Sequence, residues 1–165
     1  MMGAGKSTVG PMLARDLSRR FVDLDEEIER EAGRSIREIF AREGEASFRA
    51  LERRALERWA GRDAVVALGG GAIAQEGSPE FLAATGTVVY LRADPEVLLA
   101  RLGDGDERPL LRDLEPTARR ARIEALLEER RGAYESARIV IEAGGDDPEA
   151  LAAALALRLA GEGPA

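Results

Sequence analysis

The first eight residues constrain the fold of this chain more than any other stretch. They read Met1-Met2-Gly3-Ala4-Gly5-Lys6-Ser7-Thr8, which is most of the phosphate-binding loop pattern G-x-x-x-x-G-K-[ST]. The opening glycine of that pattern would fall one position before Met1. Because the loop leads into a helix whose N-terminal end attracts anions, we expect a helix from about Lys6 to Leu17 that faces phosphate.

Each position of this loop predicts a separate contact. Gly3 and Gly5 can adopt backbone angles that direct successive N–H groups around phosphate oxygens. Lys6 is expected to place its ammonium group on the outer phosphates, and the hydroxyl of Ser7 is expected to bind Mg²⁺. The alternative interpretation is a flexible N-terminus that matches five positions by chance.

Composition favours the phosphate-binding interpretation. Lys6 is the only lysine in the chain, and the other 23 of the 24 basic residues are arginines. A planar guanidinium group does not replace a compact ammonium group against clustered phosphate oxygens. The one position that kept lysine is therefore the position where phosphate chemistry needs it.

Length and charge exclude several classes of function. A chain of 165 residues with 45% hydrophobic content suits one domain with a core. The net charge of −7 argues against a nucleic-acid or anionic-membrane partner. The chain has no cysteine and no histidine, so acid–base chemistry falls to carboxylates. No apolar run approaches membrane-spanning length and no secretory signal opens the chain, so we expect a cytoplasmic protein.

Two carboxylates follow the first expected strand. The run from Arg19 to Asp25 is β-type, and a period of two places Asp23 and Asp25 on one side of its end. Such a pair near a phosphate loop can hold Mg²⁺ through water or accept a proton from a hydroxyl. The alternative is that these acids cap the helix that follows.

The segment from about 25 to 60 is charged and helical, with breaks at Gly33 and Gly44. Within it, Arg49 and Glu52 lie three residues apart on one helix face. They can form an ordinary surface pair. Alternatively, Arg49 binds an anionic substrate while Glu52 orients it.

The rest of the chain alternates strands and helices, which predicts a parallel three-layer α/β fold. Strand 64–68 ends at Gly69-Gly70-Gly71, where a ligand can approach the backbone unless the glycines form a loose turn. The loop around Arg108 has the composition of a closing lid, or of a charged surface loop. The remaining expected elements are helices 78–84, 95–102, 115–134 and 147–160, and strands 88–91 and 138–141.

Taken together, these stretches resemble the shikimate kinase family of P-loop small-metabolite kinases, over residues 1 to about 141. The matching stretches are Gly3-Ala4-Gly5-Lys6-Ser7-Thr8, Phe21-Val22-Asp23-Leu24-Asp25, Ile39-Phe40 with Gly44-Glu45 and Phe48-Arg49, Gly69-Gly70-Gly71, Arg108-Pro109-Leu110-Leu111, and Arg130 with Tyr134.

The resemblance implies a monomeric, cytoplasmic enzyme of aromatic amino-acid biosynthesis that transfers the γ-phosphoryl group of ATP to the 3-hydroxyl of shikimate. It implies one domain over 1–165, with a helical substrate-binding insertion at about 25–60 and a mobile lid at about 103–113. The implied catalytic residues are Lys6, Asp25 and Arg108. The implied ATP-binding residues are Gly3, Ala4, Gly5, Lys6, Ser7, Thr8, Arg101 and Arg108; the shikimate-binding residues are Asp25, Arg49, Gly70, Gly71 and Arg130; and the Mg²⁺ ligands are Ser7 and Asp23.

Two departures from the family pattern stand out. Gly132 occupies the position where the family has proline, and we expect it to loosen that segment. The family also has a central apolar strand and the first loop glycine before the residue that matches Met1. Without that strand a fold loses about 1.5–3 kcal/mol for each buried side chain, against a total stability of about 5–15 kcal/mol. We therefore expect the true translation start to lie upstream.

Two other functions fit parts of the sequence. A different small-metabolite kinase, such as a gluconate kinase, would keep the phosphate loop and lid without using Arg49 and Arg130 as a carboxylate clamp. A non-catalytic relative would bind a partner instead, although Lys6 and Asp25 are both retained.

Overall fold

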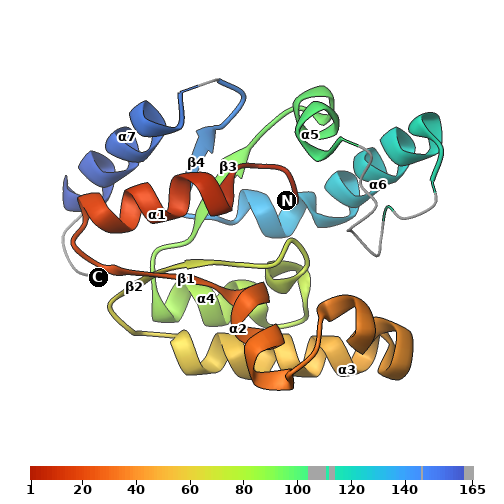
Figure 1. Cartoon of the computed structure of the whole chain (residues 1–165). Helices are drawn as coiled ribbons and strands as arrows, with labels where there is room; N and C mark the ends of the chain where they lie inside the picture. The colour runs from red at the N-terminus through yellow and green to blue at the C-terminus, as the bar shows by residue number, and fades with distance from the viewer. Residues whose placement is uncertain (104–110, 112–113, 146, 162–165) are drawn as a thin grey trace.

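The computed structural model describes residues 1–103, 111, 114–145 and 147–161. In this part of the chain, helices and short strands alternate, with a 3₁₀ helix after the second strand (Figure 1). The elements are α1 (Lys6–Asp16), β1 (Arg20–Asp23), α2 (Leu24–Ala32), α3 (Ile36–Trp59), β2 (Ala64–Ala67), η1 (Ala72–Ala74), α4 (Ser78–Thr85), β3 (Val89–Arg92), α5 (Pro95–Leu102), α6 (Pro116–Glu135), β4 (Ile139–Glu142) and α7 (Pro148–Gly161).

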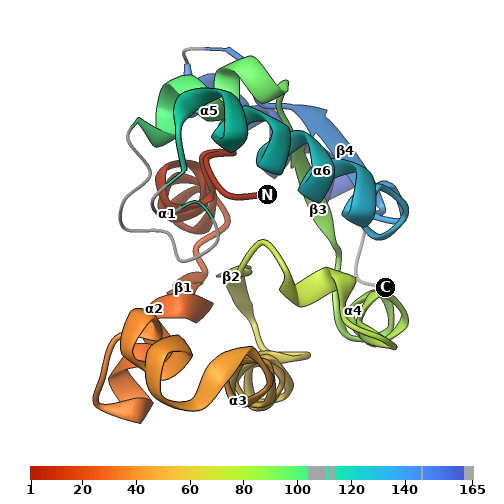
Figure 2. The ribbon, with the colours of Figure 1, turned by 90° about the vertical axis from the view of Figure 1, so that its right-hand side faces the viewer.

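The strands form two parallel pairs. β1 pairs with β2 in a register that sets Arg20 opposite Ala64, and β3 pairs with β4 with Val89 opposite Ile139. No ladder joins the two pairs within the described residues. Figure 2 shows β1 and β2 on one side and β3 and β4 on the other, with the N-terminus between them in that view. The parallel α/β prediction is confirmed, and the upstream central strand stays a prediction.

Helix α1 lies against α7 and against the first strand pair. Its Val9 and Leu13 belong to the hydrophobic core. A Cβ atom on Gly10 would lie 2.3 Å from Cε2 of Phe21, so only glycine allows this close approach of α1 to β1. The packing holds the end of β1 beside the start of α1, where the expected phosphate loop lies.

Helices α2 and α3 form a separate layer below the first strand pair (Figure 1). α2 ends at Gly33, which has a φ of 65°, and Ser35 begins α3 through a capping box with Glu38. Gly44 breaks the helical geometry inside α3, with φ 80° and ψ 176°. The breaks predicted at Gly33 and Gly44 are confirmed.

The structure corrects one boundary that matters for the site. β1 ends at Asp23, and Asp25 lies in the first turn of α2 rather than on the strand. The cause is local, because the Asp23 carboxylate accepts a hydrogen bond from the backbone N–H of Asp25 at 3.0 Å and caps α2. The capping alternative is therefore correct for Asp23.

Gly132, which departs from the family pattern, lies inside α6. The helix continues through this residue to Glu135.

Among the described residues, no helix combines the length and the apolar character that crossing a membrane requires.

Candidate functional site

One large cleft of about 1080 Å³ contains the predicted site residues. It runs between the start of α1, the first turn of α2, the middle of α3, the loop after β2 and the helices α5 and α6. The predicted residues that line it are Gly3, Ala4, Gly5, Lys6, Ser7, Thr8, Asp23, Asp25, Arg49, Gly70, Gly71, Arg101 and Arg130. Arg108 lies outside the described residues, as does most of the expected lid.

The N-terminal loop has the backbone geometry that the motif predicts. Gly3 and Gly5 have φ values of 72° and 91°, a region that side chains with a Cβ rarely adopt. The helix begins directly after Gly5, whose carbonyl accepts hydrogen bonds from the N–H groups of Thr8 and Val9. Lys6 donates from Nζ to the carbonyl of Met1 at 2.8 Å, which lays its side chain back along the loop.

Ser7 and Asp23 bring two oxygen ligands together. The Ser7 hydroxyl donates to Oδ2 of Asp23 at 3.0 Å, while Oδ1 of Asp23 caps α2. A hydroxyl and a carboxylate suit Mg²⁺, which binds few protein ligands and keeps waters and phosphate oxygens in its shell. In the described part of the chain, no group of three or more acidic, histidine or cysteine side chains could hold a metal alone. A nucleotide-bound Mg²⁺ fits the donors that are present.

Two carboxylates converge on Gly69. A Cβ atom on Gly69 would lie 2.5 Å from Oε1 of Glu52 and 2.9 Å from Oδ1 of Asp25. The loop after β2 can therefore pass between the two acids only because residue 69 is glycine. Asp25 reaches this place from the first turn of α2 and Glu52 from α3.

Glu52 is a buried charged partner of Arg49. The residue is 0% exposed, and its Oε2 accepts hydrogen bonds from Nη1 of Arg49 at 2.7 Å and from Nε2 of Gln75 at 2.6 Å. Burial raises the pKa of Glu52, the Asp25 charge raises it further, and the contacts with Arg49 and Gln75 oppose the rise. Arg49 and Glu52 form the predicted i,i+3 pair, but the pair does not lie at the surface, because Glu52 is buried.

Arg49 is held at several points. Besides Glu52, its Nη2 donates to Oε1 of Glu45 at 2.9 Å, and its guanidinium lies 5.2 Å from the Phe48 ring centroid. Sequence reasoning missed Glu45 and Gln75 as partners. Glu45 could have been found, because it lies four residues before Arg49 on the same helix face. Nothing in the local pattern around Gln75 indicates its contact.

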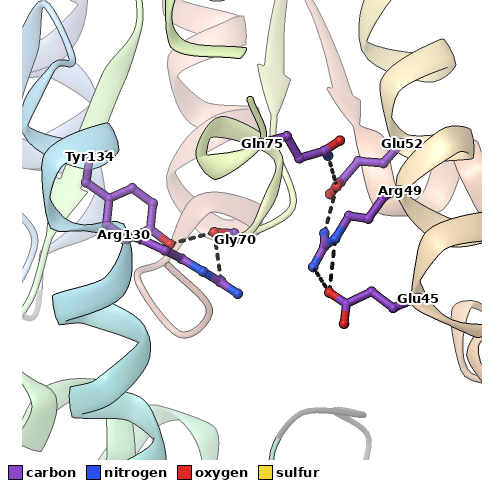
Figure 3. Close-up of polar contacts among 7 residues, drawn as sticks. All are labelled: Glu45, Arg49, Glu52, Gly70, Gln75, Arg130 and Tyr134. Carbon is purple, nitrogen blue, oxygen red and sulfur yellow. Dashed lines mark hydrogen bonds and ion pairs between the residues drawn. The ribbon is translucent and has the colours of Figure 1, made fainter. Parts of the chain in front are cut away.

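Arg130 approaches the same space from the opposite side. Figure 3 shows the guanidinium groups of Arg49, from α3, and Arg130, from α6, directed toward the space between the two helices, with Gly70 beside Arg130. Arg130 is 5% exposed and donates from Nη1 to the carbonyl oxygen of Gly70 at 3.0 Å. The hydroxyl of Tyr134 donates to the same oxygen at 2.6 Å. We refer to Arg49 and Arg130, which approach this loop from α3 and from α6, as the arginine clamp.

Arg101 closes the other end of the cleft. From α5 it donates to the carbonyl oxygens of Ala143 at 2.8 Å and Gly145 at 3.0 Å. It therefore ties α5 to the loop between β4 and α7, next to the N-terminal loop. The cleft is lined by the N-terminal loop and the start of α1, by Arg49 on α3 and Arg130 on α6, and by Asp25 in the first turn of α2.

The chain is similar to known proteins over most of its length. A model of the family described as SKI: Shikimate kinase matches residues 2–160. The shikimate kinase of Salinibacter ruber is 50% identical over 149 residues, which cover 86% of this chain and 73% of that protein. The shikimate kinase of Chlorobaculum parvum is 45% identical over 145 residues, covering 84% and 78% respectively.

Solved structures match over nearly the whole chain. A shikimate kinase from Acinetobacter baumannii in complex with shikimate superposes with a TM-score of 0.90 and 41% identity, covering 99% of this chain and 91% of that one. A shikimate kinase from Bacteroides thetaiotaomicron superposes with a TM-score of 0.87 and 35% identity, covering 98% and 93%.

Proposed function

Because this chain belongs to the shikimate kinase family, we propose that its cleft transfers the γ-phosphoryl group of ATP to the 3-hydroxyl of shikimate. The observation that carries the proposal is the clamp of Arg49 and Arg130 on opposite walls of one cleft that also contains a phosphate loop (Figure 3). A small anionic polyol needs such a local cationic site on a protein whose net charge is −7.

The acceptor is oriented at the clamp end. The guanidinium groups of Arg49 and Arg130 grip the shikimate carboxylate, since planar guanidinium forks match carboxylate geometry. The backbone at Gly70 and Gly71 lines the same pocket and contacts the ring hydroxyls. Holding the carboxylate at a fixed point places the ring hydroxyls toward Asp25, and this positioning is a large part of phosphoryl-transfer catalysis.

The nucleotide binds at the other end. The N–H groups of residues 3–8 surround the phosphates, with the N-terminal end of α1 directed at them. Lys6 leaves its contact with the Met1 carbonyl to neutralise the outer phosphates, and Arg101 packs against the adenine. Ser7 and Asp23 would hold Mg²⁺, which would supply charge neutralisation for the phosphates.

The transfer is an in-line displacement. The 3-hydroxyl oxygen forms a bond to the γ-phosphorus while the bond from that phosphorus to the β,γ-bridging oxygen breaks, so ADP leaves. The hydroxyl proton goes to the carboxylate of Asp25. Lys6, and Arg108 from the expected lid at about 103–113, stabilise the charge on the transferring group.

The proposal extends to organisation. Residues 25–60, which form α2 and α3, act as the acceptor-binding insertion of a single-domain enzyme. The enzyme works as a cytoplasmic monomer, as its resemblance to the family implies. Analytical ultracentrifugation at the enzyme concentration of the activity assay tests whether the enzyme is a monomer. A dimer that loses activity when it dissociates would contradict the proposal.

The experiment for the function is an ADP-release assay with ATP, Mg²⁺ and either shikimate or gluconate. We expect ADP release with shikimate and none above background with gluconate, and ³¹P NMR of the product should show a phosphate ester at the 3-position. Release with gluconate alone would favour a different small-metabolite kinase. Absence of release with both would favour a non-catalytic binding protein.

A further inference from the structure

The carbonyl group of Gly70 receives two hydrogen bonds from one face of α6. The Tyr134 hydroxyl donates at 2.6 Å and Nη1 of Arg130 at 3.0 Å, and the two residues lie four apart on the helix (Figure 3). Tyr134 is 4% exposed. The sulfur of Met1 lies farther from the hydroxyl, at 3.6 Å, so the single hydroxyl proton is directed to the Gly70 carbonyl.

Fixing this carbonyl also fixes the next N–H group. The peptide unit is planar, and all peptide bonds in the described residues are trans. The C=O of Gly70 and the N–H of Gly71 therefore point in opposite directions from one rigid plane. With the carbonyl held against α6, the Gly71 N–H is directed away from α6, and Gly71 lines the cleft.

The N–H group of Gly71 makes no backbone hydrogen bond in the described residues. Within the part of the chain that the structure describes, the neighbouring turn is closed by bonds from Ala72 to Gly69 and from Ala74 to Gly71, while neither Gly70 nor Gly71 donates to a backbone carbonyl. Buried or partly buried N–H groups normally have partners. An amide that lines a cleft and is held in a fixed direction is a ready donor for a ligand.

We propose that Tyr134 is a positioning residue for the acceptor substrate. Its hydroxyl holds the Gly70 carbonyl so that the Gly71 N–H and the remaining guanidinium N–H groups of Arg130 stay directed into the cleft. Tyr134 does not touch the substrate. The inference rests on the proposed function and deepens it, because it assigns the orientation of the acceptor end to a side chain behind the loop.

The ring of Tyr134 has a separate support. It stacks on Tyr90 of β3, with ring centroids 4.9 Å apart and planes inclined by 16°. Tyr134→Phe therefore removes the hydroxyl and leaves the stacked ring, so the variant is expected to fold. Tyr90→Phe is the matched control, because it removes a hydroxyl from the other ring of the same pair, and no hydrogen bond links that hydroxyl to Gly70.

The kinetic test compares wild type, Tyr134→Phe and Tyr90→Phe. For Tyr134→Phe we expect the KM for shikimate to rise roughly three- to tenfold, as for the loss of one neutral hydrogen bond, with the KM for ATP unchanged. For Tyr90→Phe we expect both values to stay at the wild-type level. A KM for shikimate that is equal in all three proteins overturns the inference, and so does an equal rise in both KM values for Tyr134→Phe.

A second measurement does not depend on the substrate. In ¹⁵N–¹H NMR spectra of the ligand-free protein, Tyr134→Phe should shift the Gly71 amide resonance and speed its exchange with solvent, whereas Tyr90→Phe should leave both unchanged. An unaltered Gly71 amide in Tyr134→Phe overturns the role of Tyr134. If wild type fails to phosphorylate shikimate, the proposed function fails, while the NMR result still decides whether Tyr134 orients this peptide.

Discussion

The guanidinium group of Arg49 lies 2.7 Å from a carboxylate oxygen of Glu52 whose side chain is completely buried. Removing a carboxylate from water costs free energy that a single cation partly offsets. In this site the second carboxylate, Asp25, also faces the loop at Gly69, which adds repulsion. Glu52 therefore holds Arg49 in place at some cost to the stability of the fold.

Replacing Glu52 with glutamine should remove a pH-dependent loss of stability. Because the pKa of Glu52 is raised above its ordinary value of 4.5, mainly by burial, the folded state retains a proton that the unfolded chain releases. The stabilising contribution is complete below pH 4.5 and is lost as pH rises through the raised pKa. The free energy of unfolding of wild type relative to Glu52→Gln should fall over that window and then level off.

Urea unfolding of both proteins between about pH 4 and about pH 8 measures this difference. Glu45→Gln is the control, because it removes a carboxylate that also contacts Arg49. The side chain of Glu45 is 57% exposed, so its carboxylate keeps most of its hydration in the folded state. A constant difference between wild type and Glu52→Gln across the range would contradict the prediction.

Replacing Arg49 with lysine should weaken the grip on the acceptor. An ammonium group keeps the charge but loses the fork that meets a carboxylate at two points. We expect the KM for shikimate to rise about tenfold or more, with a smaller effect on the KM for ATP. Arg53→Lys is the control on the same helix, since Arg53 pairs with Glu57 outside the cleft. Steady-state kinetics with unaltered values for Arg49→Lys would remove Arg49 from the site.

Replacing Lys6 with methionine should abolish transfer without unfolding the chain. The variant loses the ammonium group that we propose neutralises the phosphates, and we expect kcat to fall at least about a hundredfold with an unchanged circular dichroism spectrum. Because Lys6 is the only lysine, an amine-selective reagent should modify only Lys6 and the α-amino group, and Mg-ATP should protect Lys6. Modification of Lys6 at the same rate with and without ATP would place it away from the phosphates.

Replacing Gly71 with alanine should disturb the arginine clamp more than the fold. Gly71 has a φ of −102°, which alanine adopts without strain, but its Cβ would lie 2.7 Å from Nη1 of Arg49. The guanidinium must move, so the KM for shikimate should rise several-fold while the free energy of unfolding changes by less than about 1 kcal/mol.

Gly86→Ala is the control for that variant, because Gly86 has extended backbone angles and open space where the Cβ would lie. If Gly71→Ala and Gly86→Ala have the same KM for shikimate, binding of shikimate does not require the observed position of the Arg49 guanidinium group.

Much of this arrangement could be predicted from the sequence. Local signals predicted α1 from the Gly3–Ser7 pattern and the start of α3 from the capping box at Ser35. The same type of signal misplaced the end of β1, since the Asp23 carboxylate both ends the strand and caps α2. Alternation with a period of two residues could not distinguish an aspartate that continues a strand from one that ends it.

The contacts that hold the clamp could not be predicted in this way. Gln75 reaches Glu52 across 23 positions, and Tyr134 reaches Gly70 across 64. Each depends on how a loop folds back onto a helix, which neither periodicity nor capping determines. The family resemblance marked Tyr134 as part of a signature but carried no contact for it.

The position of the two arginines on different helices has a mechanical consequence for the proposed acceptor site. α3, which carries Arg49, leads into β2, and α6, which carries Arg130, leads into β4. An acid bound by both arginines, as we propose, would link these two helices to each other. Bound acceptor should then slow hydrogen–deuterium exchange in α3 and in α6, including turns far from the carboxylate itself.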